Sequence, residues 1–181
     1  MNLPNLITLA RLLSVPITVW LILTGQMTAA FWLFVAAGVS DAVDGFIAKR
    51  LSLTTSLGRY LDPVADKALL MSVYIALGVD AHLPDWLVIL VVFRDILILG
   101  GALLIRLFTE QAMRLEPLKI SKVNTAMQIT LAAVVLARLG IGVGDGGLSE
   151  ALIYLVAATT FLSGAAYLVR WFRGTAQAEG Q

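Results

Sequence analysis

Six long apolar stretches are the feature of this 181-residue chain that most limits its fold. About 20 apolar residues are needed for a helix to cross the hydrocarbon core of a bilayer, and each stretch is long enough to do so. The stretches cover residues 5–23, 29–48, 58–79, 86–107, 122–139 and 148–172. Short polar or glycine-containing turns separate them. The pattern predicts an all-α integral membrane protein, built as a bundle of six transmembrane helices.

Composition supports this prediction and narrows the function classes. Hydrophobic residues make up 59% of the chain and charged residues 14%, against about 45–50% and 25% in soluble domains. A net charge of +1 argues against nucleic acid as a partner, and the absence of cysteine excludes disulfides and thiolate chemistry. The first residues lack the features of a signal peptide. Because the loops are short, we predict one membrane domain over residues 1–175 and a short tail over residues 176–181.

Positive charge predicts the orientation of the bundle. Most of the 13 basic residues lie near the second connection, near the fourth connection or at the C-terminus. They are Lys49, Arg50, Arg59, Lys67, Arg106, Arg114, Lys119, Lys122, Arg170 and Arg173. Because cytoplasmic loops are enriched in Lys and Arg, we expect both termini to face the cytoplasm. The expected location is a bacterial inner membrane, with the second connection on the cytoplasmic side.

Four aspartates flank that second connection. Asp41 and Asp44 are three residues apart and Asp62 and Asp66 are four apart, so each pair shares one face of a helix. Charges at such positions are costly, and four gathered carboxylates repel one another unless a divalent cation neutralises them. Ligands that are all oxygen favour Mg²⁺, Mn²⁺ or Ca²⁺ over zinc. Helix capping and neutralisation of nearby lysines is the alternative, but four carboxylates at helical spacing favour a metal site that also binds phosphate.

Small residues interleave with these aspartates, and the combined spacing resembles a known signature. The sequence reads Asp41-x-x-Asp44-Gly45-x-x-Ala48, then Gly58-x-x-x-Asp62-x-x-x-Asp66. This resembles the signature of the CDP-alcohol phosphotransferases over 26 residues, with every gap matching. One position differs, because Lys49 stands where the family usually has arginine. Lysine reaches a phosphate as a point charge, whereas arginine binds it with a fork of two donors.

The resemblance implies a fold, substrates and roles for individual residues. It implies six transmembrane helices, often in a homodimer, with a site open to the cytoplasm, a CDP-linked lipid donor such as CDP-diacylglycerol, and Mg²⁺ or Mn²⁺, with two ions expected. The implied metal ligands are Asp41, Asp44, Asp62 and Asp66, and Asp66 is also the implied general base. The implied contacts to the CDP group are Thr8, Arg11, Gly45, Ala48, Lys49 and Gly58. For Arg11, the alternative is that its side chain only extends to the membrane surface.

The acceptor alcohol has a weaker signal. The runs Phe93-Arg94-Asp95 and Ile120 to Ala126 resemble the branch of the family that makes cardiolipin, so phosphatidylglycerol is the expected acceptor and glycerol 3-phosphate the alternative. The expected acceptor contacts are Arg94, Arg114, Lys119 and Lys122, within a group of basic residues that also includes Arg106. Arg94 has a second interpretation, a buried ion pair with Asp95 that fixes helix packing.

Two other classes of protein remain as competing hypotheses. A divalent-cation transporter would carry acidic residues along a path through the membrane, whereas here the four aspartates group on one side and Asp80, Asp85, Asp145 and Glu150 lie in the opposite loops. A membrane scaffold without catalytic activity explains the apolar stretches but not the spacing of aspartates and small residues. The sequence therefore favours a metal-dependent transferase that acts on membrane lipids.

Overall fold

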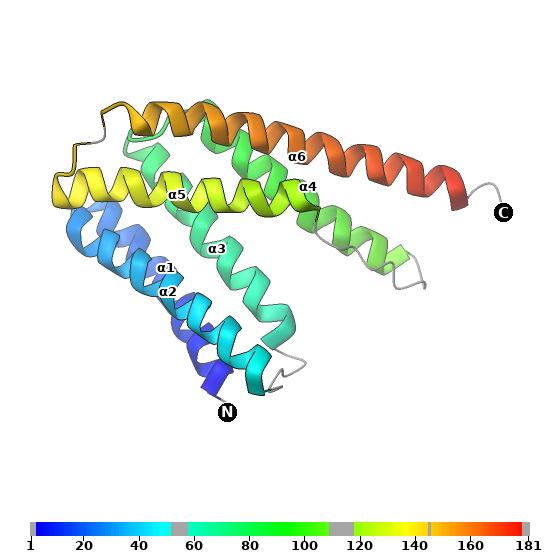
Figure 1. Cartoon of the computed structure of the whole chain (residues 1–181), viewed down its shortest axis with the longest axis horizontal. Coiled ribbons are helices and arrows are strands. Elements are labelled where there is room, and N and C mark those ends of the chain that lie inside the picture. The colour runs from blue at the N-terminus through cyan, green and yellow to red at the C-terminus, as the bar shows by residue number, and fades with distance from the viewer. Residues whose placement is uncertain (1–2, 52–57, 109–117, 145, 179–181) are drawn as a thin grey trace. The chain divides into compact units, whose positions relative to one another are not determined.

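The computed structural model describes residues 3–51, 58–108, 118–144 and 146–178, and over these ranges it contains six helices and no strand (Figure 1). The helices are α1 (Leu3–Leu23), α2 (Met27–Leu51), α3 (Gly58–Val79), α4 (Asp85–Phe108), α5 (Lys119–Ile141) and α6 (Leu148–Ala178). Each coincides, within a few residues at its ends, with one predicted stretch. The all-α prediction is confirmed for the described part of the chain. Helix α6 continues to Ala178, beyond the residue at which we predicted the domain to end.

Two of the connections use the same hydrogen-bonded turn to end a helix. After α1, the N–H of Gly25 donates to the carbonyl of Ile22 and the N–H of Gln26 donates to that of Leu21, at 2.9 and 2.8 Å. Gly25 has a φ of 72°, as this C-terminal cap requires. The end of α3 repeats the pattern with Ala81, whose φ is 56°. An alanine therefore occupies a left-handed position that glycine normally fills.

The chain divides into two compact units, which are described separately. The first comprises Met1–Asp85 with Ala132–Ser149. In it, α1 packs against both α2 and α3, and the C-terminal end of α2 lies at the same end of the unit as the N-terminal end of α3 (Figure 1). Its core includes Ile22, Val73 and Leu77, all fully buried. Because α2 and α3 share α1 as a packing partner, the two halves of the aspartate motif belong to one packed unit.

The second unit comprises Trp86–Leu131 with Glu150–Gln181, and several of its polar side chains face inward. On α4, Ile89, Phe93 and Ile96 are more than half exposed and Arg94 is buried. The interior also contains fully buried polar side chains on α5 and α6, namely Asn124, Gln128, Thr160 and Ser163. A soluble protein normally shows the reverse distribution. Apolar residues outside and polar residues between helices are typical of helices embedded in lipid.

Length and composition identify two candidate membrane spans among the described residues. They are Lys119–Ile141, which is the whole of α5, and Leu148–Trp171 in α6. Helices α1 and α2 contain shorter apolar runs, Leu9–Leu23 and Met27–Ser40. The six-span bundle, the cytoplasmic termini and the domain limits stay predictions.

The turn after α3 gives a test of these backbone conformations. We expect Ala81→Gly to raise the free energy of unfolding by about 1–2 kcal/mol, because glycine adopts a positive φ without the clash that Cβ causes. Thermal unfolding of the purified protein in detergent, followed by tryptophan fluorescence, measures the change. The matched control Gly25→Ala, at a φ of 72° with open space around the added Cβ, should lower the melting temperature. A lower melting temperature for Ala81→Gly would contradict the assignment.

Candidate functional site

The aspartate motif lies on the two helix segments that adjoin the second connection. Asp44 is in the last third of α2 and Asp66 in the first half of α3. At 1.5 Å per residue, Asp44 is about 10 Å from the end of α2 and Asp66 about 12 Å from the start of α3. The two helices run in opposite directions along α1, with these ends together (Figure 1). The backbone thus brings both halves of the motif to a similar depth.

The clearest polar contact in this unit joins two predicted site residues. Nη1 of Arg11, on α1, donates to Oδ1 of Asp66, on α3, at 2.5 Å. The side chain of Arg11 is 4% exposed and that of Asp66 is 43% exposed. The guanidinium is therefore fixed inside the helix packing, while the carboxylate it orients keeps an open side. In this structure the guanidinium of Arg11 is held between helices by Asp66 rather than exposed at the surface of the unit.

The open side of Asp66 has the chemistry that a divalent cation requires. An ionised carboxylate has two oxygens with about four lone-pair positions, so one oxygen can accept from Arg11 while the other binds a second group. The further donors predicted from the sequence, Asp41, Asp44 and Asp62, are also carboxylates. An all-oxygen donor set fits Mg²⁺ or Mn²⁺. The residues of the motif therefore fit a divalent metal by donor type.

Several predicted site residues lie outside the described side chains. Described side chains cover residues 9–40, 65–101, 118–144 and 146–171. Outside these ranges lie Thr8, Asp41, Asp44, Gly45, Ala48, Lys49, Gly58 and Asp62, although their backbones are helical, and Arg114 lies outside the described residues altogether. Among the side chains within the ranges, no group of three His, Cys, Asp or Glu is positioned to hold a metal ion. The predicted metal ligands thus stay predictions.

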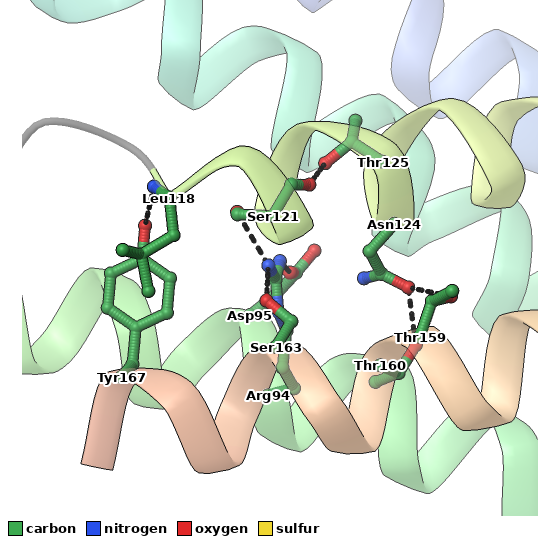
Figure 2. Close-up of polar contacts among 10 residues, drawn as sticks. All are labelled: Arg94, Asp95, Leu118, Ser121, Asn124, Thr125, Thr159, Thr160, Ser163 and Tyr167. Carbon is green, nitrogen blue, oxygen red and sulfur yellow. Dashed lines mark hydrogen bonds and ion pairs between the residues drawn. The ribbon is translucent and has the colours of Figure 1, made fainter. Parts of the chain in front are cut away.

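In the second unit, Arg94 is the centre of a buried polar network (Figure 2). Its Nη1 donates to Oδ1 of Asp95 at 2.6 Å, and its Nη2 donates to Oγ of Ser121 at 2.6 Å and to Oγ of Ser163 at 2.5 Å. Arg94 is 3% exposed and Asp95 is 1% exposed. These contacts favour the buried ion pair, the second interpretation of Arg94, over direct contact with an acceptor. Through these contacts Arg94 links its own helix, α4, to α5 and α6.

Lys119 and Lys122 occupy the exposed side of the first turn of α5. They are three residues apart, so their side chains share one face of the helix. Two positive charges on one exposed helix face are a suitable contact for an anionic head group.

Sequence reasoning missed most of the polar partners of these residues. Ser121 and Asn124 stand in a run that we noted only for its resemblance to a family branch, whereas Ser163 was not singled out. Oδ1 of Asn124 accepts from Oγ1 of Thr159 and of Thr160, at 2.8 and 2.9 Å (Figure 2). Small hydroxyl residues three or four apart on an apolar helix were the available sign that α6 has a polar inner face.

Comparison with known proteins decides the family. The family model for CDP-alcohol phosphatidyltransferase matches residues 1–162. The chain belongs to this family. That confirms the resemblance on which the roles of the aspartates depend.

Named relatives fall into both branches of the family. A rice (Oryza sativa subsp. japonica) protein named CDP-diacylglycerol–glycerol-3-phosphate 3-phosphatidyltransferase 1, chloroplastic, is 35% identical, over 94% of this chain and 57% of its own length. A rat (Rattus norvegicus) protein named cardiolipin synthase (CMP-forming) is 32% identical, over 92% and 60%. A Rickettsia typhi protein named CDP-diacylglycerol–glycerol-3-phosphate 3-phosphatidyltransferase is 30% identical, over 92% and 94%. The chain thus spans less than two thirds of the rice and rat proteins and nearly all of the Rickettsia protein.

A double-mutant cycle on thermal stability tests the contact between Arg11 and Asp66. We expect Arg11→Met and Asp66→Asn to be non-additive by about 0.5–3 kcal/mol, because the first removes the contact and the second removes its negative charge. The control cycle pairs Asp66→Asn with Thr24→Val, whose hydroxyl donates to the carbonyl of Trp20 in its own helix. That cycle should be additive within about 0.5 kcal/mol. Additivity in both cycles would show that Arg11 and Asp66 do not interact.

Proposed function

We propose that this protein transfers a phosphatidyl group from CDP-diacylglycerol to the hydroxyl of an anionic glycerol-type acceptor and releases CMP. The observation that carries the proposal is the contact between Arg11 and Asp66, which fixes the proposed base of the motif while its side chain stays 43% exposed. Family membership supports the proposal. The names of the rice, rat and Rickettsia relatives, all phosphatidyl-transferring enzymes or cardiolipin synthases, point the same way.

In this proposal, Asp41, Asp44, Asp62 and Asp66 hold two divalent ions, Mg²⁺ or Mn²⁺. When bound there, such ions would neutralise the negative charge on the diphosphate of the donor. The CDP group contacts Thr8, Arg11, Gly45, Ala48, Lys49 and Gly58. The glycines and the alanine leave room for the nucleotide close to the helix backbones. Because a guanidinium has five N–H donors, binding Asp66 through Nη1 is compatible with a further contact of Arg11 to the nucleotide.

The proposed chemical step is a direct displacement at phosphorus. Asp66 accepts the proton of the acceptor hydroxyl, and the oxygen attacks the phosphorus that carries the diacylglycerol. The bond from that phosphorus to the oxygen of the CMP phosphate breaks, and CMP leaves with the electron pair. A carboxylate is a weak base for an alcohol, so orientation of the reacting groups must supply much of the rate. The fixed partner Arg11 contributes that orientation at Asp66.

We propose phosphatidylglycerol as the acceptor, which makes the protein a CMP-forming cardiolipin synthase, with glycerol 3-phosphate as the alternative. Both acceptors carry phosphate, and Arg114, Lys119 and Lys122 are the proposed contacts. Arg94, also predicted from the sequence as an acceptor contact, is enclosed by Asp95, Ser121 and Ser163 in this structure. The proposed setting is a bacterial inner membrane, with the site facing the cytoplasm, and the family resemblance adds a homodimer. The transporter hypothesis requires ion flux without CMP release.

Measurement of CMP release separates these possibilities. The purified protein in detergent receives CDP-diacylglycerol, Mg²⁺ or Mn²⁺, and either phosphatidylglycerol or glycerol 3-phosphate. We expect CMP with phosphatidylglycerol. Release with glycerol 3-phosphate alone would move the protein to the other branch and leave the proposed chemistry intact. No CMP with either acceptor would reject the proposed function and favour the transporter.

Substitution of Asp66 tests its role as base. Because a positioned general base contributes about 10²- to 10⁴-fold, we expect Asp66→Asn to lower the rate of CMP release at least 100-fold. The control is Asp80→Asn, which alters an exposed carboxylate near His82 in the loop after α3. It should retain the wild-type rate. Full turnover by Asp66→Asn would refute the assignment.

Removal of metal tests the carboxylate cluster as a whole. We expect a chelator to abolish CMP release, because four carboxylates at close range require a cation to bind a diphosphate. Added Mg²⁺ or Mn²⁺ should restore it. Undiminished activity in the chelator would contradict the proposed metal site.

A further inference from the structure

Arg94 is too deeply buried to contact a substrate in this structure, yet it is charged and bonded to three neighbours. Its guanidinium reaches Asp95 on its own helix, Ser121 on α5 and Ser163 on α6 (Figure 2). Replacement of a buried ion pair by apolar residues is often neutral or stabilising. Stability alone therefore does not explain why a charge is present here. A role in fixing one particular arrangement of the helices does.

The helix end that Arg94 fixes is the start of α5. Ser121 lies in the first turn, and its backbone N–H donates to the carbonyl of Leu118 at 2.9 Å. The N–H of Leu118 donates in turn to the hydroxyl of Tyr167 on α6, at 3.4 Å (Figure 2). The first turn of α5 is thus fixed from its inner side by two side chains, Arg94 and Tyr167.

The same turn carries the two exposed lysines on its outer side. Lys119 and Lys122 flank Ser121 in sequence, and the N–H of Lys122 also donates to the carbonyl of Leu118. Rotation or fraying of this turn would move both ammonium groups together. The Arg94 contact to Ser121 is therefore made on the turn that carries two of the proposed acceptor contacts.

We propose that Arg94, through its bond to Ser121, is a positioning residue that orients Lys119 and Lys122 for the phosphate of the acceptor. This inference deepens the proposed function and rests on it. It replaces direct contact of Arg94 with the acceptor by an effect transmitted through one turn of α5. It predicts that loss of the Ser121 hydroxyl impairs use of the acceptor, even though this uncharged hydroxyl is not one of the proposed contacts to the acceptor phosphate.

The experiment compares Ser121→Ala, Arg94→Lys and the double variant with the wild type. CMP release is measured with acceptor and CDP-diacylglycerol varied in turn. We expect Ser121→Ala to raise the KM for the acceptor about five- to tenfold, the effect of one lost hydrogen bond of about 1–1.4 kcal/mol. The KM for CDP-diacylglycerol should stay within about twofold. The double variant should be no worse than the poorer single variant, because both break the same contact. Ser121→Thr, which keeps the hydroxyl, should restore the acceptor KM.

The matched control is Thr130→Val. Thr130 is on the same helix, and its hydroxyl donates to the carbonyl of Ala126 within that helix. This variant should leave both KM values unchanged. Hydrogen–deuterium exchange over residues 118–126 supplies a readout independent of activity. Exchange should increase in Ser121→Ala and Arg94→Lys and stay at the wild-type level in Thr130→Val.

Three results would overturn the inference. A raised acceptor KM in Arg94→Lys with none in Ser121→Ala would show direct contact with the acceptor. An equal rise in both KM values, or a fall in kcat alone, would show a general structural role. Unchanged exchange in Ser121→Ala would show that the bond does not hold the turn. If the wild type releases no CMP with either acceptor, the proposed function fails, and the exchange data alone decide whether Arg94 positions the turn.

Discussion

The constraint on which this structure depends is the cost of a polar group without a partner in an apolar environment. Water does not reach most groups in an apolar interior, so a charged group there is stabilised by a partner within the protein. Arg11 finds Asp66, and Arg94 finds Asp95 with two serines. Both arginines are almost completely buried. The helices that contain them are otherwise largely apolar. The same requirement that limits where charges can occur thus selects which helices are joined to each other.

The two arginines meet this requirement in different ways, and the difference separates their functions. The partner of Arg11 is 43% exposed, so the pair has one side from which a ligand can be bound. Arg94 and Asp95 are both enclosed. A pair with one exposed partner can take part in ligand binding or catalysis, because that partner remains accessible. A pair that is enclosed on both sides can hold helices in alignment, because water and ligands do not compete for its hydrogen bonds.

Sequence predicted the helices and the family well because those signals are local. Apolar length gave the six helices, and the spacing of aspartates and small residues along α2 and α3 gave the family, which the family model confirmed. The contact between Arg11 and Asp66 was not predicted as a pair, although both residues were named for the site. Their proximity depends on how α1 packs against α3, and no periodicity within either helix encodes it. The partners of Arg94 were missed for the same reason, since Ser163 is 69 residues away. The positive φ of Ala81 was not predicted, because the conformational preferences of single residues assign that backbone conformation to glycine.

The sequence distance between charge partners also determines when each pair can form during synthesis. Asp95 is the next residue after Arg94, so α4 emerges from the ribosome with both charges and can be neutral before α5 exists. Asp66 follows Arg11 by 55 residues, so α1 is complete long before its partner has been made. The pair that orients the proposed base therefore forms only once α3 has been translated and has packed on α1. The site therefore assembles only after α1, α2 and α3 have all been made, and until then the guanidinium of Arg11 must be satisfied by other groups.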